Sequence, residues 1–293
     1  MVSRPHSDLH GFSLKVASAR VVFPGLLAVT TALVLAACSV SSPDRYSLVW
    51  SEEFNDNQLD PQVWFVEQGD GSQYGIPGWG NNELQHYQQS NVRLEDGVLL
   101  ITAKLEPGRR PFYSSARINT RDRFVVRYGR IEASMRFPVG QGLWSAFWLL
   151  PQDEVYGEWA ASGEIDIVEA VDLGVGDNKS TLHTIHFGGA WPDNKESGAR
   201  YDVPADPTRN FHVYAVEWDE ANIRWYVDDV LVHAETNWST DVAEFPAPFN
   251  QDFYLLINLA VGGNLTSGVD SSSLPATLEV DYVRVYSERN ELG

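Results

Sequence analysis

The sequence predicts an all-β protein, a two-sheet β-sandwich or jelly roll. Three observations lead to this fold class: short strand signals recur along the chain, proline and glycine clusters separate them, and long helical periodicity is absent. The clearest strand lies at 129–137, where apolar Ile131 and Met135 alternate with charged Arg130 and Glu132. A period of two is typical of a strand with one buried face.

The remaining elements follow from the same pattern of β-branched and aromatic runs. Asp228-Asp229 fits the tight turn of a hairpin between two of these runs. The sequence has no internal repeat and no sign of a second domain. We expect the further strands at 97–103, 143–150, 164–171, 181–187, 211–218, 223–227, 230–233, 253–261 and 278–286.

The first 38 residues differ in composition from the rest. Arg4, Lys15 and Arg20 precede the apolar run 21–37, which ends in Leu-Ala-Ala directly before Cys38. A basic start, a short apolar run and small residues before a cut are typical of a secretory signal. The alternative is a permanent transmembrane anchor, for which the run is at the short end.

Cys38 is the only cysteine, so a disulfide within one molecule is impossible. Its position resembles a bacterial lipoprotein cleavage site, where the cysteine is acylated and becomes the new N-terminus. We therefore expect a secreted protein held at the cell envelope by an N-terminal lipid, in the outer membrane if the source has one; plain secretion is the alternative. We expect residues 39–45 to form a short flexible tether and residues 46–293 to form a single jelly-roll domain.

Charge and composition restrict the partners. Residues 39–293 carry 18 basic and 39 acidic residues, a net charge of −21, which repels nucleic acid and anionic lipid. A membrane contact is expected only through the lipid, and the protein is expected to be a monomer. The ten Trp residues suggest exposed aromatic faces on which sugar rings stack, although an aromatic-rich core is the alternative.

Three carboxylates occupy the expected strand 164–171. On a regular strand Glu164 and Asp166 share one face, but Glu169, five positions after Glu164, points into the core. Because an unpaired buried carboxylate is costly, we predict a β-bulge near Val168 that returns Glu169 to the face of the other two.

The predicted spacing favours catalysis with retention. With the bulge, the Cα atoms of Glu164 and Glu169 are about 13 Å apart, and the leaning side chains leave roughly 5–6 Å between the carboxyls. Retaining glycosidases need about 5–5.5 Å and inverting ones more. One acid of the three should keep a proton near neutral pH. A solvated acidic face or a calcium site is the alternative interpretation.

Beyond the bulged motif Glu-Ile-Asp-Ile-Val-Glu, several segments make the chain recognisable: it resembles glycoside hydrolase family 16, in its laminarinase branch. Val168 departs from the methionine that is commonest in the bulge, and Leu265 replaces a usual aromatic residue. Segments 151–163 and 190–208 are expected to be loops at the cleft edge. The segments that carry the resemblance are 79–85, 128–132, 144–148, 183–189 and 258–264.

The resemblance implies a β-jelly roll with a concave glycan-binding cleft, and endo-hydrolysis of β-1,3-linkages or of β-1,4 bonds beside them. Glu164 matches the nucleophile, Asp166 a helper and Glu169 the acid/base; no cofactor is implied for catalysis. His186 lies where it can hydrogen-bond one carboxylate, or it is structural. Trp144 and Trp148 match the aromatic platform of the family, and one of the two can instead be a core residue. The positions that match sugar contacts are Asn81, Glu83, Arg117, Trp144 and Trp148.

The family often carries a structural calcium far from the cleft. Matching positions are backbone oxygens near Glu53 and Gly97 and the carboxylate of Asp281, which can equally be an ordinary surface acid. Two other functions remain open. One is a galactan hydrolase of agarase or carrageenase type, and the other is a glucan-binding protein without hydrolysis.

Overall fold

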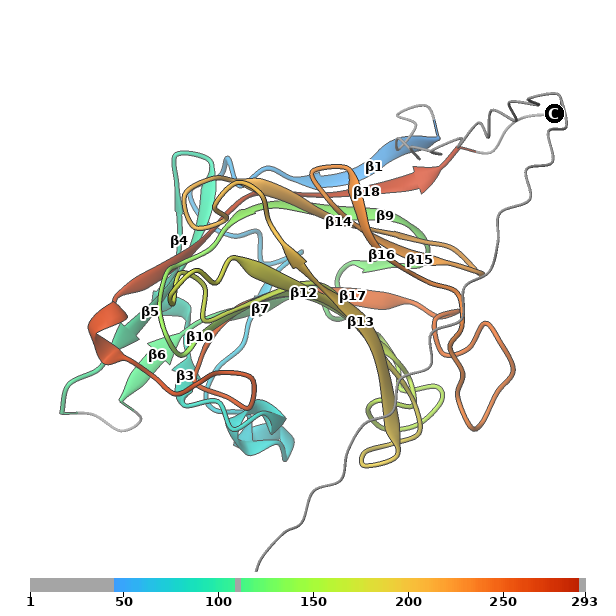
Figure 1. The fold of residues 1–293 in the computed structure, drawn as a ribbon, viewed down its shortest axis with the longest axis horizontal. Helices are drawn as coiled ribbons and strands as arrows, with labels where there is room; N and C mark the ends of the chain where they lie inside the picture. The colour runs from blue at the N-terminus through green and yellow to red at the C-terminus, as the bar shows by residue number, and fades with distance from the viewer. Residues whose placement is uncertain (1–44, 109–111, 290–293) are drawn as a thin grey trace, which may run out of the picture. The chain divides into compact units, whose positions relative to one another are not determined.

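A computed structural model describes residues 45–108 and 112–289, which form two β-sheets packed face to face (Figure 1). Apart from four short 3₁₀ segments, the described elements are all strands. Within this part of the chain every strand pair is antiparallel except β3 (Gln85–Tyr87) with β6 (Tyr113–Ser115). The predicted all-β jelly-roll sandwich is confirmed.

The first of the two sheets is here called the outer sheet. Its strand order is β16 (Val230–Glu235), β15 (Ile223–Val227), β14 (His212–Trp218), β9 (Gly129–Arg136), β18 (Ala276–Glu288), β5 (Val98–Leu105), β6 and β3, with β1 (Tyr46–Glu52) beside β18 and β4 (Val92–Glu95) beside β5.

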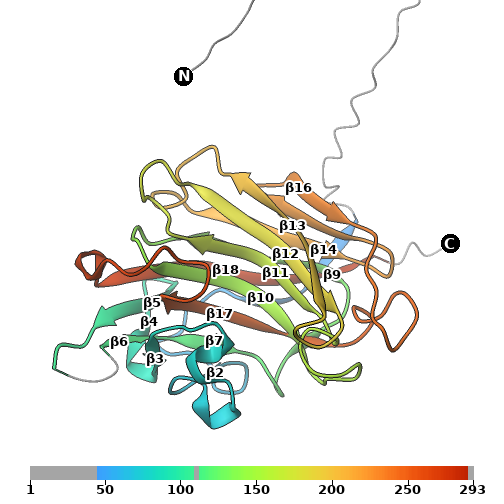
Figure 2. The same ribbon diagram turned by 60° about the horizontal axis from the view of Figure 1, so that its bottom comes forward.

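The other sheet, here called the cleft sheet, carries the carboxylate strand β11 near its middle (Figure 2). Its strand order is β13 (Asn194–Asp202), β12 (Ser180–Gly188), β11 (Glu164–Val171), β10 (Leu143–Pro151), β17 (Phe253–Val261), β7 (Arg117–Asn119) and β2 (Phe65–Val66), with β8 (Val125–Val126) beside β17.

The core lies between the sheets and follows the predicted alternation. Ile131 and Met135 of β9 are fully buried, whereas Arg130 and Glu132 lie on the opposite face. These two charged side chains are also largely buried, and their ion pair of 2.8 Å compensates part of the cost of burying the charges. β17 is buried at every position, so side chains on one of its faces fill the core and those on the other support the cleft.

The predicted hairpin at Asp228-Asp229 is confirmed, with Val227 paired to Val230 and positive φ of 49° and 61° at the two turn residues. Positive φ at both central positions is the type I′ geometry that matches the twist of the flanking strands. The predicted strands 164–171, 223–227 and 253–261 agree with the structure to the residue.

Eight of the described strands were not predicted. The segment 190–208, predicted as a loop, contains the nine-residue strand β13. The other strands that were not predicted are β1, β2, β3, β4, β6, β7 and β8. β13 is an edge strand without an apolar stripe, so its sequence carries no period of two. Its pairing with β12 through the backbone sets its conformation instead.

Residues 1–38 with Cys38, and residues 39–44 of the expected tether, lie outside the described residues. Within the described part, no helix is long and apolar enough to cross a bilayer.

Candidate active site

β11 contains the predicted bulge. Asp166 pairs with Thr184 of β12, and Glu169 pairs with Leu182, so three steps along β11 match two steps along β12. The pairing of β11 with β10 shifts at the same place. The bulge therefore inserts one extra residue between the second and third carboxylates, as the spacing of the acids predicted.

The extra residue changes which side chains face the core. Ile167 and Val168, although adjacent, are both fully buried in the core cluster. After them Glu169 returns to the cleft side, and both Glu164 and Glu169 line the same cleft. Asp166 lies between them and is only 3% exposed.

Glu164 is half-buried at the start of β11 and is reached by a loop side chain. The indole N–H of Trp159 donates a hydrogen bond to a carboxylate oxygen of Glu164. Trp159 also packs beside His186, with ring centroids 5.6 Å apart. Gly163, which precedes Glu164, adopts φ of +87° and lets the loop 151–163 turn sharply into the strand.

Glu169 is held differently. It is 8% exposed, and burial together with the nearby charge of Glu164 raises the pKa of Glu169 to about 7. The Trp144 indole N–H donates to one of its oxygens at 3.0 Å and partly offsets this rise, because the bond favours the ionised form. Glu169 therefore holds a proton for much of the time at neutral pH.

Next to Glu164, the buried Asp166 pairs with the partly buried His186. Nε2 of His186 lies 3.3 Å from a carboxylate oxygen of Asp166. Burial and the charges of Glu164 and Glu169 raise the pKa of Asp166 well above its usual value. Burial by itself would lower the pKa of His186, but the hydrogen bond and charges of the acids outweigh it and raise that pKa to about 10.

The ligand atoms of Glu164, Asp166 and His186 lie within 4.8 Å of one another. The imidazolium form of His186 has no free lone pair and carries a positive charge, so it opposes a cation at this cluster. The arrangement is suited to holding and transferring protons among these groups, and not to the calcium site considered for these acids. His186 thus lies where it was predicted, next to a carboxylate.

These groups open into a cleft of about 1520 Å³. Its lining extends from Phe65 of β2 across the whole cleft sheet to Arg200 of β13. Figure 2 shows the broad face of this sheet, with β10, β11 and β12 at its centre. Of the predicted sugar contacts, the cleft lining includes Asn81, Arg117, Trp144, Trp148 and His186.

Arg117 is fixed between two aromatic rings on one side of the cleft. Its guanidinium lies 4.8 Å from the ring centroid of Trp79 and 4.7 Å from that of Trp148. Nε is 3.2 Å from a carboxylate oxygen of Glu67, and both side chains are almost buried. This arrangement fixes the orientation of the guanidinium and of the two aromatic rings. Ligands that both stack on rings and accept hydrogen bonds, such as sugars, can bind to such a surface.

Glu83 differs from the expectation of a direct sugar contact. It does not line the cleft among the described residues, and its carboxylate accepts hydrogen bonds from Gln85 at 2.6 Å and the Tyr87 hydroxyl at 2.8 Å. Tyr87 is in turn bonded to Asn258, which accepts the indole N–H of Trp148 at 2.8 Å. Glu83 therefore supports Trp148 indirectly, through the hydrogen bonds of Tyr87 and Asn258.

The two platform tryptophans have different environments. Trp144 is 8% exposed and its N–H is used by Glu169, whereas Trp148 is half-buried and anchored through Asn258. Both line the cleft, so neither is purely a core residue. Sequence reasoning missed Trp159 and Trp79. Trp159 lies in an irregular loop, where only its closeness to Glu164 in the sequence gave a signal.

The three predicted calcium positions lie on or next to strands of the outer sheet. β18 has a bulge at Asp281, which is exposed; on one side Val280 pairs with Leu99, and on the other Val283 pairs with Glu52. Glu53 follows Glu52 directly, and Gly97 lies two residues before Leu99. The Glu53 carboxylate itself accepts two hydrogen bonds of 2.9 Å from Arg284.

Comparisons with known proteins match this architecture. The model of the glycosyl hydrolases family 16 covers residues 79–284. The chain is 46% identical over 262 residues to glucan endo-1,3-beta-glucosidase A1 of Niallia circulans, covering 83% of this chain and 38% of that protein. It is 40% identical over 270 residues to the beta-glucanase of Rhodothermus marinus, covering 86% and 91%.

Among solved structures, the laminarinase catalytic domain of Thermotoga maritima MSB8 is similar, with a TM-score of 0.74 and 34% identity over 84% of this chain and 100% of that one. The family model thus covers well over half of the sequence, including both cleft glutamates. Relatives aligned over most of their own length share its fold. The chain belongs to glycoside hydrolase family 16.

Proposed function

We propose that this chain is a retaining endo-glycosidase that hydrolyses internal β-1,3-glucosidic bonds of laminarin-type β-glucan, and also β-1,3-1,4-glucan. The observation that carries the proposal is the pair Glu164 and Glu169 in one cleft, brought to the same side by the bulge. The names of the two enzymes to which the chain is similar at 46% and 40% identity support the substrate class.

The two glutamates divide the chemistry between them. Glu169, with its raised pKa of about 7, donates a proton to the leaving glycosidic oxygen. The carboxylate of Glu164 attacks the anomeric carbon and forms a covalent glycosyl-enzyme. Glu169, now ionised, then accepts a proton from a water molecule that attacks the same carbon and releases the sugar with its original β-configuration.

Asp166 and His186 adjust the charge around the nucleophile. The positive His186 partly compensates the two acids, and Asp166 with its raised pKa holds a proton more readily than an ordinary aspartate. The three acids therefore need not all be negatively charged at the same time when Glu169 gives up its proton. Trp159 keeps one oxygen of Glu164 in a fixed direction.

The extent of the cleft supports attack within a polymer. Its lining crosses all seven strands in the path of the cleft sheet, from β13 to β2. With about 4.8 Å between strands, this is a groove of roughly 29 Å. Glu164 and Glu169 on β11 lie away from either end, so sugar units can bind on both sides of the cleaved bond.

A product profile tests the proposal directly. Purified protein is incubated side by side with laminarin, lichenan, agarose and carrageenan, and early products are followed by proton NMR. We expect oligosaccharides from laminarin and lichenan with the β-anomer appearing first, and none from Glu164→Ala. Early α-anomer would contradict retention, cleavage of agarose or carrageenan alone would favour the galactan hydrolase, and binding of laminarin without products would favour the binding protein.

We propose further that the protein is exported and anchored to the cell envelope through a lipid on Cys38, outside the described residues. The basic start, the apolar run and the single cysteine support this location. Cys38→Ser should move the protein from the membrane fraction to the soluble fraction, while Ser39→Ala should not. Membrane association of Cys38→Ser would exclude the lipid anchor.

We also propose a structural Ca²⁺ at the β18 bulge, held by the Asp281 carboxylate and by backbone oxygens near Glu53 and Gly97. The exposed carboxylate at a bulge and the adjacent turns support a hard-cation site built from oxygen ligands. Ca²⁺ at 100 times its Kd should stabilise the fold by about 2.7 kcal/mol. A calcium-dependent rise in Tm that persists in Asp281→Ala would contradict this site.

A further inference from the structure

Two consecutive carbonyl groups at the bulge of β11 are held by buried side chains. The Trp225 indole N–H donates to the carbonyl of Asp166 at 2.8 Å. Nδ1 of His183 lies 2.7 Å from the carbonyl of Ile167. In a regular antiparallel ladder the carbonyls of a central strand bond to neighbouring strands, so these side-chain donors mark the place where the ladder is interrupted.

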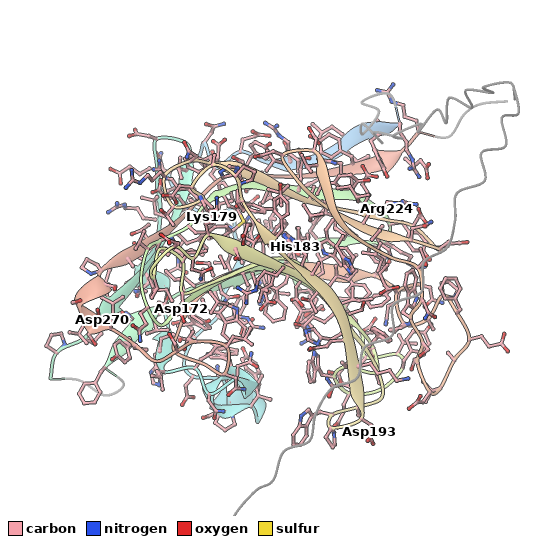
Figure 3. The ribbon with its side chains drawn as sticks, viewed as in Figure 1. Asp172, Lys179, His183, Asp193, Arg224 and Asp270 are labelled. Carbon is pink, nitrogen blue, oxygen red and sulfur yellow. The ribbon has the colours of Figure 1, made fainter. Side chains whose placement is uncertain are left out.

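The two donors come from different sheets of the sandwich. Trp225 belongs to β15 of the outer sheet and is fully buried, so its bond crosses the sandwich. His183 belongs to the neighbouring strand β12 and is also fully buried (Figure 3). The register places it directly opposite the two-residue bulge, because its neighbours Thr184 and Leu182 pair with the residues on either side.

The ring of His183 is fixed in one protonation state. A carbonyl can only accept, so Nδ1 carries the hydrogen, and Nε2 accepts from the Thr181 hydroxyl at 2.9 Å. Burial lowers the pKa of His183 to about 4, which keeps the imidazole neutral at neutral pH. Both nitrogens are therefore used, and the ring has little freedom to turn.

We propose that Trp225 and His183 are positioning residues that hold the β11 bulge and thereby set the place of Glu169 relative to Glu164. The inference rests on the proposed roles of the two glutamates. From Glu164 to Asp166 the register with β12 is regular, so this part of the strand does not depend on the two bonds. Without them the bulge can shift, and the residue displaced is Glu169, which follows it.

This separation gives the proposal a specific kinetic signature. A sugar leaving group needs a proton from the acid, whereas a dinitrophenolate leaves without one. Displacing Glu169 while Glu164 stays in place should therefore slow hydrolysis of laminarin much more than formation of the glycosyl-enzyme from an activated aryl β-laminaribioside. A general loss of packing would slow both reactions by the same factor.

The first test compares Trp225→Phe with the matched control Trp218→Phe. Trp218 is also buried in the outer sheet, and its N–H donates to the carbonyl of Phe249 at 3.1 Å, away from the bulge. We expect Trp225→Phe to lower kcat/KM on laminarin by about tenfold or more and on dinitrophenyl β-laminaribioside by less than about threefold. Trp218→Phe should change both values by the same factor.

The second test uses His183, so that a folding failure of one variant does not end the experiment. His183→Asn keeps an N–H at nearly the position of Nδ1, whereas His183→Leu removes it. Only His183→Leu should reproduce the selective loss on laminarin, and His183→Asn should restore most of it.

The outcomes separate the two claims. Equal losses on both substrates in Trp225→Phe and His183→Leu would overturn the positioning role while leaving the proposed hydrolysis intact. A wild-type protein that cleaves neither substrate would remove the proposed function and the positioning role together.

Discussion

At the scale of single residues, the site works because similar groups have different surroundings. Glu164 and Glu169 are the same amino acid on one strand and each accepts an indole N–H, yet Glu169 is buried and Glu164 is half-buried. Burial, together with the charge of Glu164, raises the pKa of Glu169 to about 7. The sequence predicted that one acid would keep its proton, but it could not identify Trp144 and Trp159 as the donors.

Replacing Trp144 by Phe should move the alkaline limb of the pH–activity profile. The Trp144 N–H favours the ionised form of Glu169, so its removal raises the pKa of Glu169 above about 7. Because the acid must be protonated, activity should persist to higher pH, by about one unit for a charge-assisted bond. The measurement is kcat/KM on laminarin against pH.

Trp148→Phe is the control for that experiment, because its N–H is given to Asn258 and not to a carboxylate. It should weaken sugar binding without moving the limb. A limb that moves to lower pH in Trp144→Phe would show that the indole does not stabilise the ionised acid.

At the scale of elements, β11 was predictable because two independent requirements meet on it. Three acids must reach one face and the isoleucines must reach the core, and a single extra residue satisfies both. β13 had no such requirement, since most of its side chains face solvent and only the backbone pairs it with β12. The supporting role of Glu83 was not predictable for a similar reason: its partner Tyr87 is close in sequence, but Tyr87 is bonded to Asn258, which is 171 residues away.

The turn into β11 provides a prediction at this scale. Gly163 has φ of +87°, and a Cβ there would lie 2.9 Å from the ring of Phe249. Gly163→Ala should therefore cost about 1–3 kcal/mol of folding stability and lower kcat by displacing Glu164. Thermal and urea unfolding together with laminarin kinetics measure both effects.

Gly157→Ala separates backbone strain from the clash. Gly157 lies in the same loop with φ of +115°, but a Cβ there meets no atom closer than 3.5 Å. It should lose some stability and keep kcat. Equal kinetic losses in the two variants would mean that the loop backbone, and not the fit against Phe249, controls Glu164.

At the scale of the whole molecule, the charge is strongly one-sided. Residues 39–293 carry 18 basic and 39 acidic residues, and the repulsion among these acids acts against the folded state. Raising NaCl from about 10 to 200 mM should therefore raise Tm by about 2–4 °C, because the screening length falls from about 30 to below 10 Å.

The salt experiment is run with a chelator present, so that divalent cations do not contribute. The same titration with Glu279→Gln, which removes one partner of the half-buried Arg136–Glu279 ion pair, tests whether a local ion pair dominates the salt dependence of Tm. A Tm that falls with NaCl would mean that salt bridges outweigh the general repulsion.

The outer sheet has one further consequence, for the order in which the protein can be made. Among the described strands β18 is the last along the chain, yet it lies inside the sheet, between β9 and β5 and beside β1. It leaves the ribosome after the other described strands, so an emerging chain has a gap in the middle of this sheet until β18 is complete. Such a nascent chain stays open and can be threaded, which is the state that the export proposed above requires.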